Sequence, residues 1–225
     1  ARCRGFPGSR SGFRTHCRSR LSCQYAMNRI AIEAKGDFLE RLSNATPIKA
    51  IAELIWNGLD AGAGRVAVRL ETNALGGIEA IRVTDDGFGI NHAHVQPLFG
   101  GLGDSWKRQK ARLNGRALHG KTGQGRFKAF ALGNQVEWRT VYDSPAGRMR
   151  FQVLGRAEAL TDLEYSDPVA AGADPTGTEV IVTGIQDSLG SLQRDTARVE
   201  LARLFAEYLS QYPGIDLEHE GVRVD

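Results

Sequence analysis

Glycines and a lysine near the middle of the chain could bind a phosphate group in two different ways. The stretch GRALHGKTGQG occupies residues 115–125. Its first part fits the phosphate-loop pattern G-x-x-x-x-G-K-[ST] at Gly115, Gly120, Lys121 and Thr122. Its last part fits the pattern G-x-x-G-x-G at Gly120, Gly123 and Gly125. Both patterns place backbone amides against a phosphate, but they belong to unrelated folds with different catalytic residues.

The first pattern lacks the structural context that it needs. A phosphate loop of that kind follows a buried strand and opens a helix, whereas residues 104–114 (DSWKRQKARLN) are mostly polar and basic. Gly123 and Gly125 would occupy the first helical turn, where each glycine costs about 1 kcal/mol. The best strand-ending carboxylate pair, Asp85 and Asp86, precedes the loop, whereas the Asp that holds the magnesium water in such folds follows it. The sequence therefore favours the second pattern.

Polar residues also follow one side of a helix predicted over residues 47–62. Glu53, Asn57 and Asp60 are spaced i, i+4 and i+7, so they fall within a sector of roughly 60°. The opposite side carries Ile51, Ile55 and Leu59. Such a stripe is commonly a solvated face, but Asn, Gly and Asp are poor helix formers. The sequence NGLDAG therefore indicates a chemical use for these side chains.

Two further stretches could contact a ligand. In DDGFG (85–89) a predicted strand ends on a carboxylate, and two glycines then allow a close approach of the backbone. In GTEVIVT (177–183) Thr178 shares one face of a predicted strand with two valines. That threonine either bonds to neighbouring backbone or points at a ligand.

Together these pieces resemble the ATP-binding domain shared by DNA gyrase B, the ninety-kilodalton heat-shock chaperone, sensor histidine kinases and MutL. The family pattern is E-x-x-x-N-x-x-D-A, D-x-G-x-G, G-x-x-G-x-G and G-T. In the same order this chain has Glu53–Asn57–Asp60–Ala61, Asp85–Gly87–Gly89, Gly120–Gly123–Gly125 and Gly177–Thr178. The resemblance spans about residues 29–212, and SWK at 105–107 is similar to the start of the family's ATP lid.

The resemblance implies binding of ATP with Mg²⁺. Asn57 would ligate the metal through its side-chain oxygen, and Glu53 would orient and deprotonate the attacking water. Asp85 would accept from the adenine amino group, assisted by Thr178. Candidate phosphate charges are Lys107, Lys121, Arg126 and Lys128, with Lys121 the best candidate and a catalytic one. The remaining expected nucleotide contacts are Asp60, Gly87, Gly89, Ile90, Gly120, Gly123, Gln124, Gly125 and Phe127.

The pattern of elements predicts an α+β two-layer sandwich, a mixed and mostly antiparallel sheet with helices on one face. The resemblance implies the same architecture, the Bergerat fold. Strands are predicted over 29–32, 65–72, 78–86, 134–142, 148–160 and 177–185, and a hairpin over 213–225. Helices are predicted over 36–44, 47–62, 91–99, 123–133 and 191–212, the last with Val199, Leu201, Leu204, Phe205 and Leu209 on its apolar side. Residues 100–122 have no clear period, which is typical of a functional lid or of disorder.

Charge divides the chain into unequal parts. Residues 1–26 contain six arginines and no acidic residue, so the net charge of +3 leaves −3 on the remainder. This basic extension has three alternative interpretations: residues foreign to the natural protein, a transit peptide, or a genuine basic arm. We expect the ATP-binding domain over 27–212 and the start of a following segment of a longer protein over 213–225.

The mildly acidic remainder gives no whole-domain electrostatic argument for nucleic acid. All three cysteines, Cys3, Cys17 and Cys23, lie in the extension, so neither a disulfide framework nor a thiolate metal site is indicated. No apolar run reaches the ~18–20 residues of a membrane helix. A cytoplasmic protein without membrane contact is therefore expected.

Glu53 favours hydrolysis, because histidine kinase domains that resemble the rest of the pattern typically lack this glutamate. Within the family, the chain most resembles the chaperone, MutL and microrchidia groups. We expect slow ATP hydrolysis, with lid closure driving homodimerisation of a longer protein, and a client protein or DNA bound beyond residue 225. The alternatives are a nucleotide-sensing module with negligible turnover and a histidine-kinase-type phosphotransfer domain.

Overall fold

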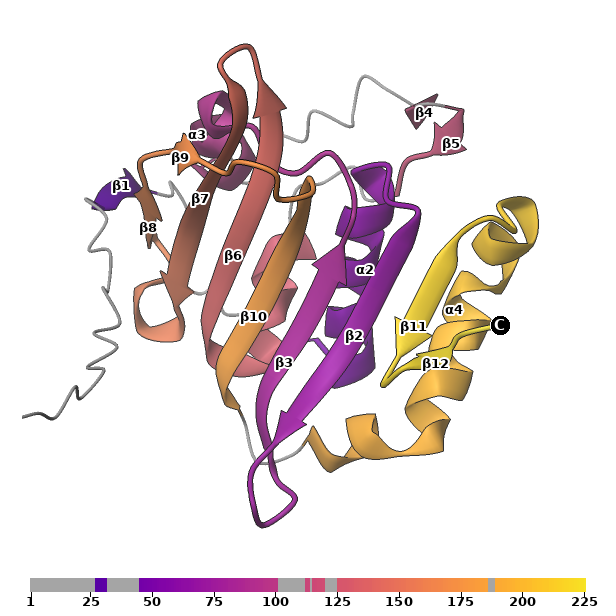
Figure 1. Cartoon of the computed structure of the whole chain (residues 1–225). Helices are drawn as coiled ribbons and strands as arrows, with labels where there is room; N and C mark the ends of the chain where they lie inside the picture. The colour runs from indigo at the N-terminus through magenta and orange to yellow at the C-terminus, as the bar shows by residue number, and fades with distance from the viewer. Residues whose placement is uncertain (1–26, 32–44, 101–111, 114, 120–124, 186–188) are drawn as a thin grey trace, which may run out of the picture.

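The computed structural model describes residues 27–31, 45–100, 112–113, 115–119, 125–185 and 189–225. One mixed sheet dominates it, with the strand order β1-β8-β7-β6-β10-β3-β2-β11-β12 and with β9 paired to β7 (Figure 1). Its strands are β1 Met27–Ala31, β2 Arg65–Thr72, β3 Ile78–Asp85, β6 Gly133–Ser144, β7 Gly147–Arg156, β8 Asp162–Ser166, β9 Val169–Ala170, β10 Gly177–Ile185, β11 Asp216–His219 and β12 Val222–Arg223. Among the described strands, pairing is antiparallel except between β11 and β2.

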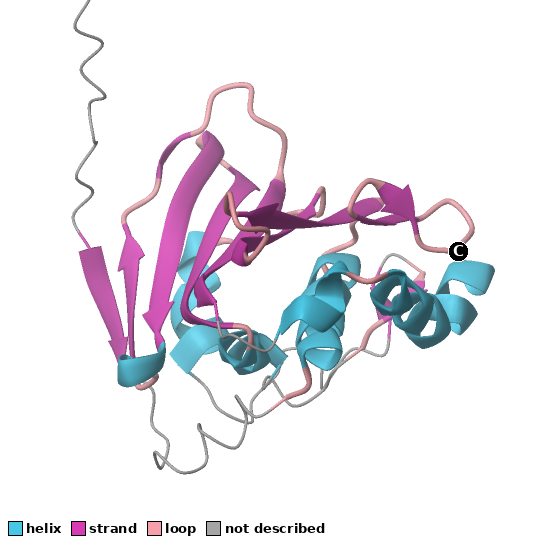
Figure 2. Cartoon of the chain, turned by 90° about the horizontal axis from the view of Figure 1, so that it is seen from below, coloured by secondary structure: helices cyan, strands magenta, loops and turns pink. Residues whose placement is uncertain are grey.

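The helices lie on one face of this sheet (Figure 2). They are α2 Pro47–Asp60, α3 Val95–Gly100 and α4 Asp195–Gln211, with short 3₁₀ helices η1 His92–His94, η3 Gly125–Ala131, η4 Ala157–Ala159 and η5 Leu189–Gln193. A two-stranded hairpin, β4 Arg112–Leu113 and β5 Arg116–Ala117, stands apart from the sheet. The predicted α+β sandwich, a mostly antiparallel sheet with helices on one face, is confirmed.

Alternation along the strands decides which side chains meet the helices. On β6, Val136, Trp138 and Tyr142 are buried, and Thr140 lies in the same alternating set. On β10, Thr178 shares the buried face with Val180 and Val182. The sheet therefore presents two threonines to the layer that also holds α2.

Helix α2 begins at Pro47 as predicted and ends at Asp60, just before the predicted end at residue 62. Pro47 opens it, where the missing amide hydrogen removes no helical bond, and Gly62 has a φ of +77° just beyond its end. Ile51, Ile55 and Leu59 are fully or almost fully buried. The apolar side of α2 thus packs into the core, and its polar side remains for other contacts.

Helix α4 departs from its predicted apolar side. Leu201 and Phe205 are buried, but Val199 and Leu204 are 46% and 47% exposed. The buried stripe consists of Ala197, Leu201, Phe205 and Tyr208, which recur every three or four residues. The prediction was wrong for Val199 and Leu204 because this single stripe is narrower than the apolar set in the sequence.

Other boundaries differ more modestly. The helix predicted over 123–133 is described as the 3₁₀ helix η3 from Gly125 onward, and the strand predicted over 148–160 ends at Arg156, where η4 follows. Strands β8 and β9 were not predicted. Asn91 caps η1 by accepting from the Ala93 amide at 2.9 Å. The helix predicted over 36–44 lies outside the described residues.

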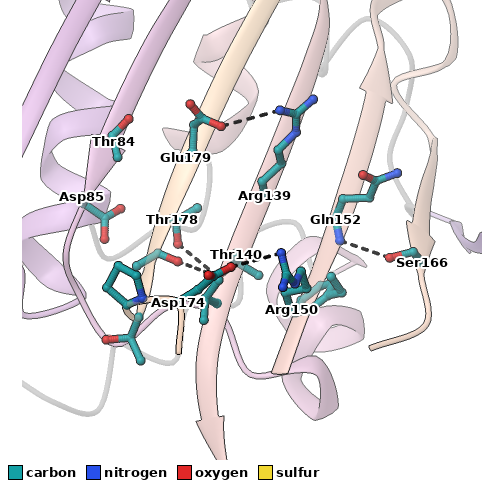
Figure 3. A pocket seen from close by; sticks show the side chains of 15 residues that line it. Thr84, Asp85, Arg139, Thr140, Arg150, Gln152, Ser166, Asp174, Thr178 and Glu179 are labelled. Atoms are coloured by element: carbon teal, nitrogen blue, oxygen red, sulfur yellow. Dashed lines mark hydrogen bonds and ion pairs between the residues drawn. The ribbon is translucent and has the colours of Figure 1, made fainter. Parts of the chain in front are cut away.

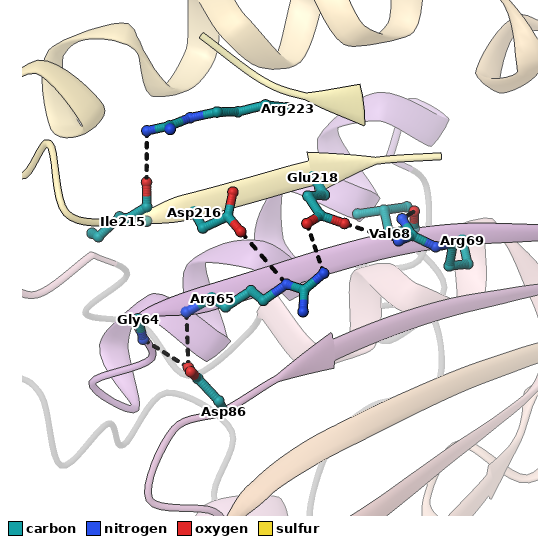
Figure 4. A network of polar contacts seen from close by, with 9 residues as sticks. All are labelled: Gly64, Arg65, Val68, Arg69, Asp86, Ile215, Asp216, Glu218 and Arg223. Carbon is teal, nitrogen blue, oxygen red and sulfur yellow. Dashed lines mark hydrogen bonds and ion pairs between the residues drawn. The ribbon is translucent and has the colours of Figure 1, made fainter. Parts of the chain in front are cut away.

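The C-terminal hairpin predicted over 213–225 is confirmed, and it extends the same sheet. Figure 4 shows how β11 is held beside β2. Glu218 accepts from Arg65 at 2.7 Å through one oxygen and from Arg69 at 2.9 Å through the other. These arginines lower the pKa of Glu218. The pairing joins the last described residues to the strand that directly follows α2.

Within the described ranges, no helix has the length and apolarity needed to cross a membrane.

Candidate functional site

The polar side of α2 carries three predicted site residues that have different surroundings. Asn57 is exposed, Glu53 is partly buried and Asp60 is 2% exposed. An Asp60 carboxylate oxygen accepts from the His119 amide at 2.8 Å. The His119 ring stacks on Trp56 with the centroids 4.2 Å apart. Asp60 therefore fixes the residues just before the predicted glycine loop against α2.

Asp85 ends β3 directly opposite α2. A side chain on Gly58 would lie 2.8 Å from the Asp85 Cβ, so only glycine permits this approach. One Asp85 oxygen accepts from the Gly87 amide at 2.9 Å. Burial raises the pKa of Asp85 to about 6, although the amides of Gly87 and Thr178 lower it to a smaller extent. The carboxyl is thus fixed in position and partly shielded from water, and it remains largely ionised at neutral pH.

The loop that follows Asp85 is held between two backbone segments. A Cβ on Gly87 would lie 2.6 Å from the Ala61 carbonyl oxygen. Gly89 has a φ of +70° and would direct a side chain into the Val141 carbonyl. The Phe88 amide donates to the Ala61 carbonyl at 2.9 Å. Both predicted glycines are therefore required by close packing, whatever they also do for a ligand.

Thr178 belongs to a buried hydroxyl pair. Its hydroxyl lies 3.2 Å from that of Thr140, which is its register partner on β6. The Thr140 hydroxyl accepts from the Ile90 amide at 2.8 Å and can donate to the Gly177 carbonyl at 3.2 Å. Thr178 also pairs with Asp85 across the β3–β10 ladder. These contacts connect Asp85, Thr178 and Ile90 at one end of the sheet.

Sequence reasoning missed Thr140 and Gly58. Thr140 gave the same signal as Thr178, a hydroxyl among inward-facing apolar residues of a strand. Gly58 was seen only as part of a poor helical sequence, and its partner Asp85 is remote in the chain.

At the other end of the site, Glu53 contacts η3. One Glu53 oxygen forms an ion pair with the Lys128 ammonium, and the other lies where a side chain on Gly125 would be. The Arg126 guanidinium lies over the rings of Phe99 and Phe127 and donates to the Phe99 carbonyl at 3.4 Å. Burial lowers the pKa of Arg126 to about 10.

The structure thus places most of the described candidate residues in two groups, one around Asp85 and one around Glu53. Gly58 is in close contact with Asp85, which Gly87 and Thr178 adjoin, and Thr140 connects Thr178 with Gly89 and Ile90. Gly125 lies near Glu53. Phe127 is buried in the core. The predicted contacts Lys107, Gly120, Lys121, Gly123 and Gln124 lie outside the described residues. Among the described residues, no group of three or more His, Cys, Asp or Glu side chains could hold a metal ion.

A cavity of about 430 Å³ lies over the face of the sheet that is turned away from the helices (Figure 3). Its arginines are engaged in ion pairs, Arg150 with Asp174 at 3.0 Å and Arg139 with Glu179 at 3.7 Å. It shares with the candidate site only the strand ends around Asp85, Thr140 and Thr178. The cavity is therefore separate from the polar side of α2.

Comparison with known proteins matches this arrangement to a family. A sequence model described as "Histidine kinase-, DNA gyrase B-, and HSP90-like ATPase" matches residues 45–162, more than half of the chain. That span contains α2, the Asp85 loop and η3.

Several relatives share the description "DNA mismatch repair protein MutL". The protein of Mesorhizobium japonicum is 49% identical over 234 residues, covering 85% of this chain and 35% of the relative. That of Methanothrix thermoacetophila is 27% identical over 188 residues, covering 79% and 29%. That of Pelotomaculum thermopropionicum is 45% identical over 66 residues, covering 29% and 10%. The chain spans about a third or less of the length of these relatives. It belongs to the histidine kinase-, DNA gyrase B- and HSP90-like ATPase family, as a MutL-like member.

Proposed function

We propose that this chain binds Mg²⁺-ATP between α2 and the sheet and hydrolyses it slowly. The observation that carries the proposal is the Asp85 carboxyl, fixed at the end of β3 by Gly87 and opposed by a helix glycine. A half-buried acceptor of this kind suits the amino group of adenine. Guanine presents a carbonyl at the same position, so a carboxylate would repel it. The site therefore selects ATP over GTP.

The hydroxyl pair supports the base site. Thr140 accepts from the Ile90 amide, so its own hydrogen is available to Gly177 or to Thr178. With Thr140 donating to Gly177, the Thr178 hydroxyl can donate to Thr140 and accept from a ligand or a water. Thr178 then assists Asp85 in binding adenine.

The phosphates would lie at the Glu53 end of α2. Asn57 is exposed one turn from Glu53, and its amide oxygen is a ligand that Mg²⁺ accepts, with phosphate oxygens and waters completing the octahedron. Glu53 would act as the general base for the attacking water. Residues 120–125, with Lys121, would bind the phosphates at the start of η3.

Closure and assembly are proposals about a longer protein. We propose that the lid predicted over 100–119 closes on ATP and that closure promotes homodimerisation. The MutL relatives are described as DNA mismatch repair proteins, which supports DNA as a partner of the complete protein, with a client protein as the alternative. A cytoplasmic location would give such a protein access to ATP.

The experiment compares Glu53→Ala, Asn57→Ala and Lys121→Ala in nucleotide binding and phosphate release. Glu53→Ala should retain ATP affinity and lose turnover by about 10²–10⁴-fold, as expected for a positioned base. Asn57→Ala should weaken the magnesium-dependent part of binding. If Glu53→Ala and Asn57→Ala are silent and Lys121→Ala abolishes binding, the phosphate-loop alternative is correct instead. ATP binding without turnover in the wild type would favour the nucleotide-sensing alternative.

A further inference from the structure

Glu53 is held by a cation that lies far away in the sequence. The Lys128 ammonium forms an ion pair with one Glu53 oxygen, and the two side chains are only 31% and 21% exposed. Pairs at the exposed surface contribute little because water and salt screen them. This pair is partly shielded, so it constrains the carboxylate more than a surface pair would.

The geometry of η3 explains how the lysine reaches Glu53. A 3₁₀ helix has three residues per turn, so residues three apart lie in line. Gly125 and Lys128 have this spacing, and both contact the Glu53 carboxylate. Gly125 leaves room for one oxygen, because a side chain there would collide with it, and Lys128 binds the other.

The other cation of η3 is directed elsewhere. Arg126 donates to the Phe99 carbonyl and lies over two phenylalanine rings. Lys128 is thus the η3 cation that contacts Glu53, and η3 directly follows the residues predicted to bind phosphate.

We propose that Lys128 is a positioning residue for Glu53: it fixes the carboxylate in the orientation from which it acts on the attacking water. This inference rests on the proposed role of Glu53 as general base. Loss of the ion pair would leave Glu53 free to rotate about its side-chain bonds, and a misplacement of about 1 Å can lower a rate by ~10²-fold. Because the Lys128 ammonium pairs with Glu53 and not with a phosphate, removal of the Lys128 charge should leave ATP affinity largely unchanged.

The test measures kcat, KM and the ATP dissociation constant for Lys128→Ala, Lys128→Arg and the control Lys49→Ala. Lys49 is an exposed lysine in the first turn of α2. Lys128→Ala should lower kcat by about 10- to 100-fold with KM and affinity within about twofold of wild type. Lys128→Arg should restore most of kcat, and Lys49→Ala should match wild type. If Lys128→Ala does not fold, Lys128→Met keeps the apolar stem and replaces it in the comparison.

A double-mutant cycle with Glu53→Ala separates positioning from direct phosphate contact. If Lys128 acts through Glu53, adding Lys128→Ala to Glu53→Ala lowers kcat no further. Additive losses, or a Lys128→Ala variant that loses ATP affinity and keeps kcat, would overturn the inference. Full turnover by Glu53→Ala would instead refute the proposed base. Full turnover by Lys128→Ala beside an inactive Glu53→Ala would refute the positioning role alone.

Discussion

Replacing Asp85 with asparagine should stabilise the protein while strongly weakening ATP binding. Burial raises the pKa of Asp85 from 3.8 to about 6. Since a pKa change of one corresponds to about 1.4 kcal/mol, the ionised carboxyl destabilises the fold by about 3 kcal/mol. Asp85 binds its proton more tightly in the folded protein than in the unfolded one, so the bound proton stabilises the fold. This contribution is complete below pH 3.8 and is lost as the pH rises through about 6. A neutral amide avoids that loss at pH 7.

The hydrogen bonds decide how the amide is oriented. The Gly87 amide donates to one Asp85 oxygen at 2.9 Å, so in Asp85→Asn the amide oxygen should take that position. The NH₂ group then replaces the other oxygen and opposes the adenine amino group, donor against donor. We therefore expect a gain of about 1–3 kcal/mol in the free energy of unfolding at pH 7, together with a fall in ATP affinity of about tenfold or more.

Denaturant unfolding at pH 7 and at pH 4.5, with nucleotide titration, provides the assay. The gain should shrink at pH 4.5, where the wild-type carboxyl is protonated. Asp86→Asn is the matched control: Asp86 is exposed and one of its oxygens accepts from the Gly64 and Arg65 amides at 2.7 and 2.8 Å. That variant should bind ATP and show no such gain. An Asp85→Asn protein that is less stable than wild type at pH 7, or that binds ATP normally, would refute the reasoning.

Three other substitutions or conditions test the site. ATP affinity should fall as the pH drops below about 6, since protonation of Asp85 removes an acceptor; a flat binding profile from pH 7.5 to 5 would argue against this. Gly58→Ala should gain up to about 1 kcal/mol of helix propensity but lose about 1–3 kcal/mol by overpacking against Asp85, so calorimetry should show a net loss and titration weaker ATP binding. Thr140→Val leaves the Ile90 amide without its acceptor and should cost about 1–3 kcal/mol in unfolding free energy; an unchanged melting temperature would contradict the hydroxyl network.

Much of the candidate site could be predicted because its signals are local in sequence. The spacing of Glu53, Asn57 and Asp60 needs only helical geometry, and the Asp85 loop needs only a strand end followed by glycines. The strand alternation that predicts β2, β3, β6 and β10 is equally local, and so is the glycine that ends α2. Each of these features belongs to one helix or strand, and the fold class was predicted from the order of such individually predicted elements.

The features that escaped prediction depend on contacts between remote segments. The role of Thr140 depends on the strand register that places it opposite Thr178. Gly58 is required because Asp85, from a distant strand, packs against it. The Lys128–Glu53 pair joins residues 75 apart. The parallel pairing of β11 with β2 depends on a match between distant strands. On α4, only packing decides that Leu201 is buried and Leu204 is exposed.

The most direct test of the account is the equilibrium affinity of this chain for ATP and for GTP, measured with Mg²⁺ by displacement of a fluorescent ATP analogue. The account predicts that ATP displaces the analogue at concentrations at least about tenfold lower than GTP does, because one misplaced donor or acceptor at the base edge is equivalent to about 1.4 kcal/mol or more. Equal displacement by the two nucleotides would contradict the assignment of Asp85 as the adenine acceptor.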